Sequence, residues 1–104
     1  MDQAVVRPLP ERDFDANADV LRAIAHPLRL RILCTLKDSA LSVGDVEMAT
    51  GIGQPGLSQQ LAVLRRAHLV NTRKVGKQVI YSVARERMLA VADMLDALAG
   101  TTVG

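Results

Sequence analysis

One stretch near the middle of the chain, residues 42 to 70, restricts the fold more than any other part of the sequence. Ser42 is a candidate N-cap for a short helix, "VGDVEMAT", and Gly51 is a suitable residue to end that helix. Two glycines and a proline follow, and then comes the strongly helical stretch "LSQQLAVLRRAHLV". A helix, a short turn and a second helix are typical of a helix-turn-helix motif.

The second of these helices has one apolar side and one polar side, and Pro55 fits its first helical position. The apolar side carries Leu57, Leu61 and Leu64. The opposite side carries Ser58, Gln59, Ala62 and Arg66. A glutamine amide can make paired hydrogen bonds to adenine in the major groove, and a serine hydroxyl can reach base edges or phosphates. The polar side of this helix therefore suits the reading of bases. An ordinary amphipathic surface helix is the alternative interpretation of this segment taken alone.

Two β-prone runs follow, Val70 to Val75 and Gln78 to Val83, and Gly76-Lys77 joins them. This pattern predicts a β-hairpin. Arg73 and Lys74 enter the turn and Lys77 lies in it, so the tip is cationic. A helix-turn-helix followed by a basic hairpin indicates a winged helix whose wing touches phosphates or the minor groove. A structural cap with lysines that serve solubility is the alternative.

The charges are distributed unevenly along the 104 residues, although the net charge is only +2. Between residues 48 and 85 there are six basic residues and no Asp or Glu, whereas the rest of the chain holds seven basic and eleven acidic residues. The six are Arg65, Arg66, Arg73, Lys74, Lys77 and Arg85. A cationic face of this kind favours binding to a polyanion by counterion release. A solvated basic face without a partner is the other interpretation.

Length and composition predict one small, mainly α domain with a small β-hairpin. Hydrophobic residues make up 49% of the chain but aromatic residues only 2%, which suits packed helices. Helical spacing begins at Phe14 and ends at the "HP" of residues 26 and 27, and a second, largely apolar helix, "PLRLRILCTLKD", follows. We expect a flexible tail over 1–13, a folded domain over 14–99 and a C-terminal tail over 100–104.

The N-terminus lacks a basic start followed by a long apolar run, and no window approaches a membrane span. We therefore expect a cytoplasmic protein with no membrane partner. One Cys, two distant His residues and no Gly-rich phosphate loop make no credible catalytic set, so we expect neither an enzyme nor a cofactor.

The last predicted helix, "ERMLAVADMLDALAG", carries a wider apolar surface than one small core can cover. Its apolar residues are Met88, Leu89, Val91, Ala92, Met94, Leu95 and Leu98. We expect a homodimer that uses this surface, and simple packing into the monomer is the alternative.

Four segments together resemble the ArsR/SmtB family of small winged-helix repressors, and within it the branch with the HlyU regulators and the sulfide-responsive repressors. They are "AIAHPLRLRILCTL", "LSVGDVEMATG", "GQPGLSQQLAVLRRAHLV" and "TRKVGKQVIYSV". The resemblance implies a dimer through the first and last helices, with recognition helices in successive major grooves of a dyad-symmetric operator. It places Gln54, Ser58, Gln59 and Gln60 on the recognition helix and Arg73, Lys74, Lys77 and Gln78 on the wing.

The chain departs from the family at its sensor sites. Where arsenic and cadmium sensors of the family carry a Cys-x-Cys pair, this chain has Ser42 and Gly44, and the last helix lacks the histidines of the zinc and nickel sensors. No metal is therefore expected. Cys34 matches the first of two reactive cysteines of the sulfide-responsive branch, but the second is missing, so a dithiol switch cannot form. Two interpretations stay open for Cys34, a one-thiol sulfur or redox sensor and an inert buried core thiol.

These observations predict a dimeric DNA-binding repressor that occupies a promoter operator with half-sites about one helical turn apart. The bases would be read by Gln54, Ser58, Gln59 and Gln60. Phosphates or the minor groove would be contacted by Arg65, Arg66, Arg73, Lys74 and Lys77, and Gln78 on the wing is a further DNA-binding residue. A winged-helix protein-interaction module without specific DNA binding is the alternative function.

Overall fold

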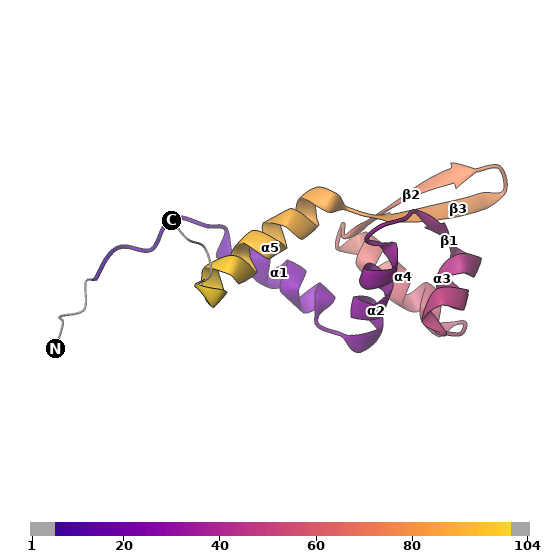
Figure 1. Ribbon diagram of the computed structural model, residues 1–104, viewed down its shortest axis with the longest axis horizontal. Helices are drawn as coiled ribbons and strands as arrows, with labels where there is room; N and C mark the ends of the chain where they lie inside the picture. Colours follow the sequence, from indigo (N-terminus) through magenta and orange to yellow (C-terminus); the bar gives the residue numbers. More distant parts are fainter. Residues whose placement is uncertain (1–5, 101–104) are drawn as a thin grey trace.

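The computed structural model describes residues 6–100, and within them the chain forms five helices and three strands (Figure 1). In chain order these are α1 (Phe14–Ile24), α2 (Pro27–Leu36), β1 (Leu41–Ser42), α3 (Val43–Thr50), α4 (Gly56–Arg66), β2 (Val70–Val75), β3 (Gln78–Val83) and α5 (Arg85–Ala99). The mainly α fold with a β-hairpin is confirmed. The outer parts of both expected tails, 1–5 and 101–104, lie outside the described residues.

The three strands form one antiparallel sheet in the order β1-β3-β2. β2 and β3 are the expected hairpin with the expected bounds, and Val75 pairs with Gln78 next to the turn. Gly76 has a φ of 61°, as a two-residue hairpin with glycine at its first central position requires. β1 is not predicted from the sequence, since Ser42 is interpreted there only as the N-cap of the helix that follows. Leu41 pairs with Tyr81 and Ser42 with Ile80, so the wing is joined to the start of α3.

The core lies where α2, α3, α4 and the base of the hairpin meet. Its fully buried side chains are Ile32, Val46, Leu57, Leu61, Leu64 and Leu69. The three leucines of α4 therefore face the core, as the helical wheel predicts. α2 is largely apolar, but one side of it is exposed and carries Leu30 and Cys34. The helix ends at Leu36, two residues before the predicted end.

Local capping explains where several helices begin and end. Ser42 Oγ accepts a hydrogen bond from the backbone N of Asp45, and Gly51 ends α3 with a φ of 71°, so both predictions for this helix are confirmed. α4 begins one residue later than expected, at Gly56, and Pro55 is its N-cap. Pro55 has no side-chain oxygen to cap the helix, and a neighbouring residue supplies that oxygen instead.

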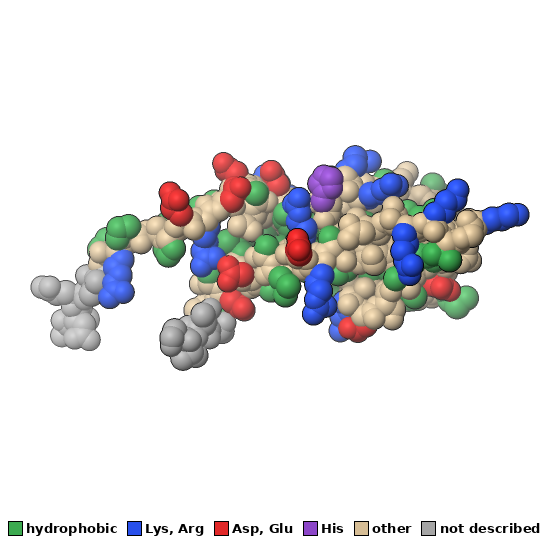
Figure 2. Space-filling model, turned by 90° about the horizontal axis from the view of Figure 1, so that it is seen from above, with side chains coloured by type: hydrophobic (Ala, Val, Ile, Leu, Met, Phe, Trp, Pro, Cys, Tyr) green, Lys and Arg blue, Asp and Glu red, His purple; other side chains and the backbone are tan. Residues whose placement is uncertain are grey.

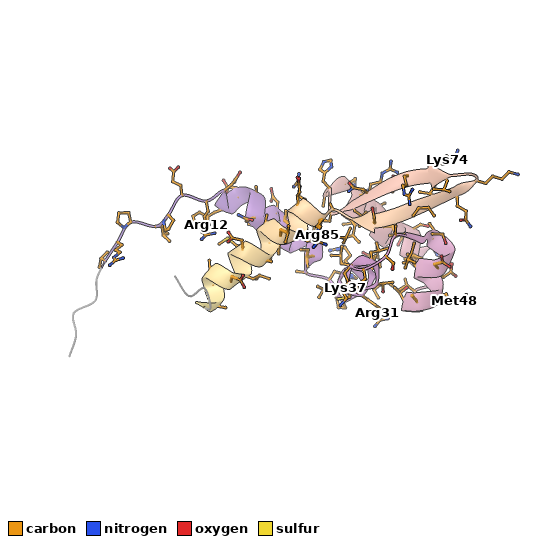
Figure 3. The ribbon with its side chains drawn as sticks, turned by 45° about the horizontal axis from the view of Figure 1, so that its top comes forward. Arg12, Arg31, Lys37, Met48, Lys74 and Arg85 are labelled. Atoms are coloured by element: carbon orange, nitrogen blue, oxygen red, sulfur yellow. The ribbon has the colours of Figure 1, made fainter. Side chains whose placement is uncertain are left out.

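The molecule is elongated, because α1 and α5 lie side by side and extend away from the other elements (Figure 1). Asp13 caps α1 by accepting a hydrogen bond from the backbone N of Ala16. Arg12 reaches across to α5, where its Nη1 atom lies 2.8 Å from Oδ2 of Asp93 (Figure 3). The contact between Arg12 and Asp93 joins the start of α1 to α5. None of the helices in residues 6–100 has the length and apolar character that crossing a bilayer requires.

Candidate nucleic-acid interface

The turn between α3 and α4 is held by hydrogen bonds at Thr50. The Thr50 hydroxyl donates to the carbonyl oxygen of Val46 at 2.7 Å and accepts from the backbone N of Ile52 at 3.2 Å. From α2, Nη1 of Arg31 donates to the carbonyl oxygen of Thr50 at 3.3 Å. Thr50 and Ile52 are buried, so the turn is part of the core and fixes α4 relative to α3.

The outward side of α4 is polar and exposed. Ser58, Gln59, Arg65 and Arg66 are exposed, and Ala62 is half-buried. Because successive residues of an α-helix are rotated by about 100°, Gln59 and Arg66 lie opposite the leucine stripe, at the centre of this side. The side carries amide, hydroxyl and guanidinium groups and no carboxylate, which matches the donors and acceptors on base edges and phosphates.

Gln54 lies just before α4 and caps it. Its Oε1 atom accepts hydrogen bonds from the backbone N of Ser58 at 3.0 Å and from the Ser58 hydroxyl at 2.8 Å. The first bond satisfies one of the backbone donors that a helix leaves free at its N-terminus. Gln54 and Ser58, both predicted to read bases, therefore form one hydrogen-bonded unit on the exposed surface.

Gln60 differs from its neighbours because it contacts another helix. It is half-buried, and its Oε1 atom accepts a hydrogen bond from Nη1 of Arg29 at 3.0 Å. Nε of the same arginine donates to the carbonyl oxygen of Ala23 in α1 at 2.6 Å. Arg29 thus connects α1, α2 and α4. Arg29 was not predicted from the sequence, because Gln60 is distant in the sequence and is brought close only by the tertiary fold.

The wing carries the other predicted contact residues, Arg73, Lys74, Lys77 and Gln78, all of them exposed. Lys74 extends from the wing into solvent in Figure 3. The register places Arg73 opposite Ile80 and Lys74 opposite Val79, so no carboxylate faces either cation across the hairpin. Within residues 6–100, the ion pairs present involve Arg12, Arg22 and Lys37, all of which lie outside α4 and the wing.

The charge separation seen in the sequence is also a separation in space. In Figure 2, Lys and Arg side chains gather at the wing end of the molecule, whereas most Asp and Glu side chains lie toward the end formed by α1 and α5. Since α4 and the wing both belong to the segment without acidic residues, the fold brings the two cationic elements to the same half of the molecule. A polyanion is attracted to such a surface even before specific contacts form.

Cys34 is exposed on α2, so the interpretation of it as a buried core thiol is wrong for the single chain. It lies in an open groove of about 390 Å³ between α2, the end of β3 and α5. The groove is lined by Leu33, Cys34, Lys37, Val83, Arg85, Met88, Leu89 and Ala92. The side chain is exposed because it points away from Ile32 and Leu36, the residues by which α2 enters the core.

Both histidines have structural roles. Nδ1 of His26 accepts a hydrogen bond from the backbone N of Leu28 at 3.1 Å and so caps α2. His68 adopts left-handed geometry with a φ of 59°, in the turn between α4 and β2. Among the described residues, no group of three or more His, Cys, Asp or Glu side chains is arranged to hold a metal ion.

Comparisons with known proteins agree with this architecture. The family model described as "Bacterial regulatory protein, arsR family" matches residues 26–72, which run from the N-cap of α2 into β2. The chain is 43% identical over 85 residues to the biofilm growth-associated repressor of Xylella fastidiosa, covering 82% of this chain and 75% of that protein. It is also 43% identical over 79 residues to the transcriptional activator HlyU of Vibrio cholerae, covering 76% of this chain and 73% of that protein.

A solved structure shows the same fold. The crystal structure of the transcriptional repressor BigR from Xylella fastidiosa matches with a TM-score of 0.66 and 41% identity, covering 81% of this chain and 86% of the other. The match extends the similarity from the helix-turn-helix to most of the folded chain. The chain therefore belongs to the ArsR family of bacterial transcription regulators, winged helix-turn-helix proteins that are not enzymes.

Proposed function

We propose that this chain is a homodimeric repressor that binds a dyad-symmetric operator in duplex DNA and thereby blocks a promoter. α4 enters the major groove with its exposed polar side, and the wing lies over the adjacent backbone or minor groove. The observation that carries this proposal is the exposed side of α4 joined to a cationic wing, in a segment of the chain without any Asp or Glu.

In this arrangement the contacts divide into two groups. Gln54, Ser58 and Gln59 face the base edges, and Gln60 lies at the border with α2. The backbone is contacted by Arg65, Arg66, Arg73, Lys74, Lys77 and Gln78. Backbone contacts set the register of the protein on the duplex, and base contacts select the sequence. One relative is named a repressor and another an activator, and repression is favoured here because a dimer on its operator excludes other proteins from that DNA.

The dimer is proposed to form through α1 and α5. Several large apolar side chains at this end of the molecule are exposed in the single chain, among them Phe14, Leu89, Leu95 and Leu98. Leu98 is 72% exposed. Large apolar side chains clustered on a small protein's surface mark an interaction site. A twofold dimer would cover them and place two copies of α4 about one helical turn of DNA apart, roughly 34–36 Å.

The test is fluorescence anisotropy of the reduced protein with the promoter duplex next to its own gene, repeated over a series of salt concentrations. A DNA-binding repressor gives an affinity that falls steeply as salt rises, because each phosphate contact releases counterions. A protein-interaction module gives weak binding that changes little with salt. The second result, obtained also with a randomised duplex pool, would exclude the proposed function.

We further propose that Cys34 makes DNA binding sensitive to reactive sulfur, supported by its exposure in the groove between α2 and α5. The Cys34 thiolate attacks the outer sulfur of a low-molecular-weight persulfide, RSSH. A new S–S bond forms on Cys34, the original S–S bond of the persulfide breaks, and the released thiolate RS⁻ takes up from water a proton equivalent to the one that the Cys34 thiol lost on ionisation, and leaves as RSH. The added sulfur enters the groove beside α5, a helix of the proposed dimer.

A glutathione persulfide donor tests this proposal in the same anisotropy assay. We expect treatment to weaken operator binding, reductant to restore it, and Cys34→Ser to bind normally without responding to the donor. If the untreated and treated wild-type proteins bind equally well, Cys34 is not a sensor and the repressor function stands without it.

A further inference from the structure

The three glutamines at α4 differ in what their amide groups already bond. Oε1 of Gln54 accepts two hydrogen bonds, both from Ser58. Oε1 of Gln60 accepts one from Arg29. Gln59 is exposed, and its side chain makes no hydrogen bond to any other group in the part of the chain that the structure describes. The three residues look equivalent in the sequence but are not equivalent in the fold.

The paired contact of a glutamine with adenine needs both ends of the amide. The amide oxygen accepts from N6–H of the base, and the amide nitrogen donates to N7. A carbonyl oxygen has two lone pairs, and both lone pairs of Gln54 Oε1 are used by Ser58. Gln54 is therefore left with donors alone and cannot make the paired contact while it caps α4.

Gln60 is excluded by its direction. It lies between Leu57 and Leu64 on the helix surface, since it is three residues after the first and four before the second. Both leucines are fully buried, so Gln60 sits at the edge of the core and points toward α2, where Arg29 holds it. An amide in this place faces the protein rather than the groove of the DNA.

Gln59 is placed as the paired contact with adenine requires. It lies opposite the buried leucines, and Ala62, three residues further on the same side, is small enough to let the helix approach the base pairs. Arg66 follows one turn beyond Ala62 and can hold the phosphates while Gln59 reaches the base.

We propose that Gln59 selects adenine in each half of the operator, and that Gln54 and Gln60 position α4 without selecting a base. This inference rests on the proposed DNA-binding function and adds to it the base that is read and the residue that reads it.

The test begins with selection from a pool of random duplexes, using the full-length wild-type chain and its Gln59→Ala and Gln60→Ala variants. Alanine is a good helix former and Gln59 is exposed, so Gln59→Ala keeps the fold. For the wild type we expect one strongly preferred adenine at symmetric positions of the two half-sites. Gln59→Ala loses this preference by about tenfold or more at each position, as the removal of a paired hydrogen bond implies. Gln60→Ala binds more weakly but selects the same sequence.

A second measurement replaces the preferred adenines by 7-deazaadenine, which lacks the N7 acceptor. The wild type and Gln60→Ala should lose affinity on this duplex, whereas Gln59→Ala should bind both duplexes equally. If Gln59→Ala keeps the wild-type adenine preference, or if Gln60→Ala is the variant that loses it, the inference is wrong while DNA binding stands. If the wild type enriches no sequence and binds no duplex, the proposed function itself fails and the inference falls with it.

Discussion

The two ends of the molecule differ in how completely a single chain can build them. At one end, α2, α3, α4 and the hairpin enclose the fully buried core residues, and the exposed surface is polar and cationic. At the other end, α1 and α5 bury few side chains, with Val20 and Val91 the buried residue of each helix, and leave large apolar ones exposed. The first end is complete as a monomer, and the second leaves apolar side chains that the proposed dimer would cover. The proposed DNA-binding surface and the proposed dimer surface are therefore separate.

The largest effect is expected from the core of the DNA-binding end. Leu64→Ala removes a side chain with no exposed surface from α4, and we expect it to lower the free energy of unfolding by about 2–5 kcal/mol. Urea denaturation followed by circular dichroism measures the change. Leu89→Ala is the matched control at the other end, where Leu89 is 58% exposed, provided that all proteins are diluted until they are monomeric, because the proposed dimer would bury Leu89. Equal losses for the two variants in the monomer would show that the ends do not differ as described.

Assembly should depend on the other end alone. Leu98→Lys places a cation in the last turn of α5, where the helix tolerates it, but buries an unpaired ammonium in the proposed interface. We expect the dimer dissociation constant to rise about tenfold or more, measured by analytical ultracentrifugation over a concentration series. Met48→Lys puts the same charge on exposed α3 and should leave the dimer intact. If the dimer stays intact with Leu98→Lys but dissociates with Met48→Lys, the interface does not lie at the end formed by α1 and α5.

The cationic surface can be tested one charge at a time. Lys74→Ala removes an exposed cation from the wing. We expect the slope of log affinity against log salt to become shallower by about 1 for each phosphate that the variant no longer neutralises, hence about 2 for a dimer. Arg22→Ala is the control, because Arg22 lies on α1 and pairs with Asp19. An unchanged slope for Lys74→Ala would remove the wing from the proposed interface.

A smaller effect is expected at the cap of α3. Ser42→Ala removes the oxygen that accepts from the backbone N of Asp45, and we expect a loss of about 1 kcal/mol in stability. This corresponds to a fall in Tm of roughly 4–8 °C for a domain of this size. Ser39→Ala, at an exposed position in the preceding loop, should leave Tm unchanged. If both variants melt at the same temperature, the cap contributes nothing measurable.

The parts of the fold that were predicted correctly are those with strong local signals. The cap at Ser42, the glycine stop at residue 51 and the spacing of leucines in α4 are each encoded in neighbouring residues, and so are the bounds of the hairpin. β1 was missed because two residues are too few for a periodic pattern and their partners, Ile80 and Tyr81, are distant in the sequence.

The candidate site was predicted as a set of residues but not as a set of contacts. Sequence placed Gln54, Gln59 and Gln60 together on a polar surface, and only the fold shows that Ser58 and Arg29 occupy the amide oxygens of two of them. Whether Cys34 is exposed could not be decided from the sequence for a related reason. The residues around it on α2 are apolar, and whether such a helix is covered on all sides depends on how the other helices pack.

The pairing of β1 with β3 has a consequence for how this protein is controlled. Because Leu41 and Ser42 lie in the same sheet as the wing and lead directly into α3, the wing and the helix-turn-helix cannot move independently without breaking backbone hydrogen bonds. The wing and the helix-turn-helix of one chain thus form a single rigid unit. In the proposed dimer, we expect a signal that lowers DNA affinity to act by altering the distance or angle between two such units, while each unit keeps its own shape.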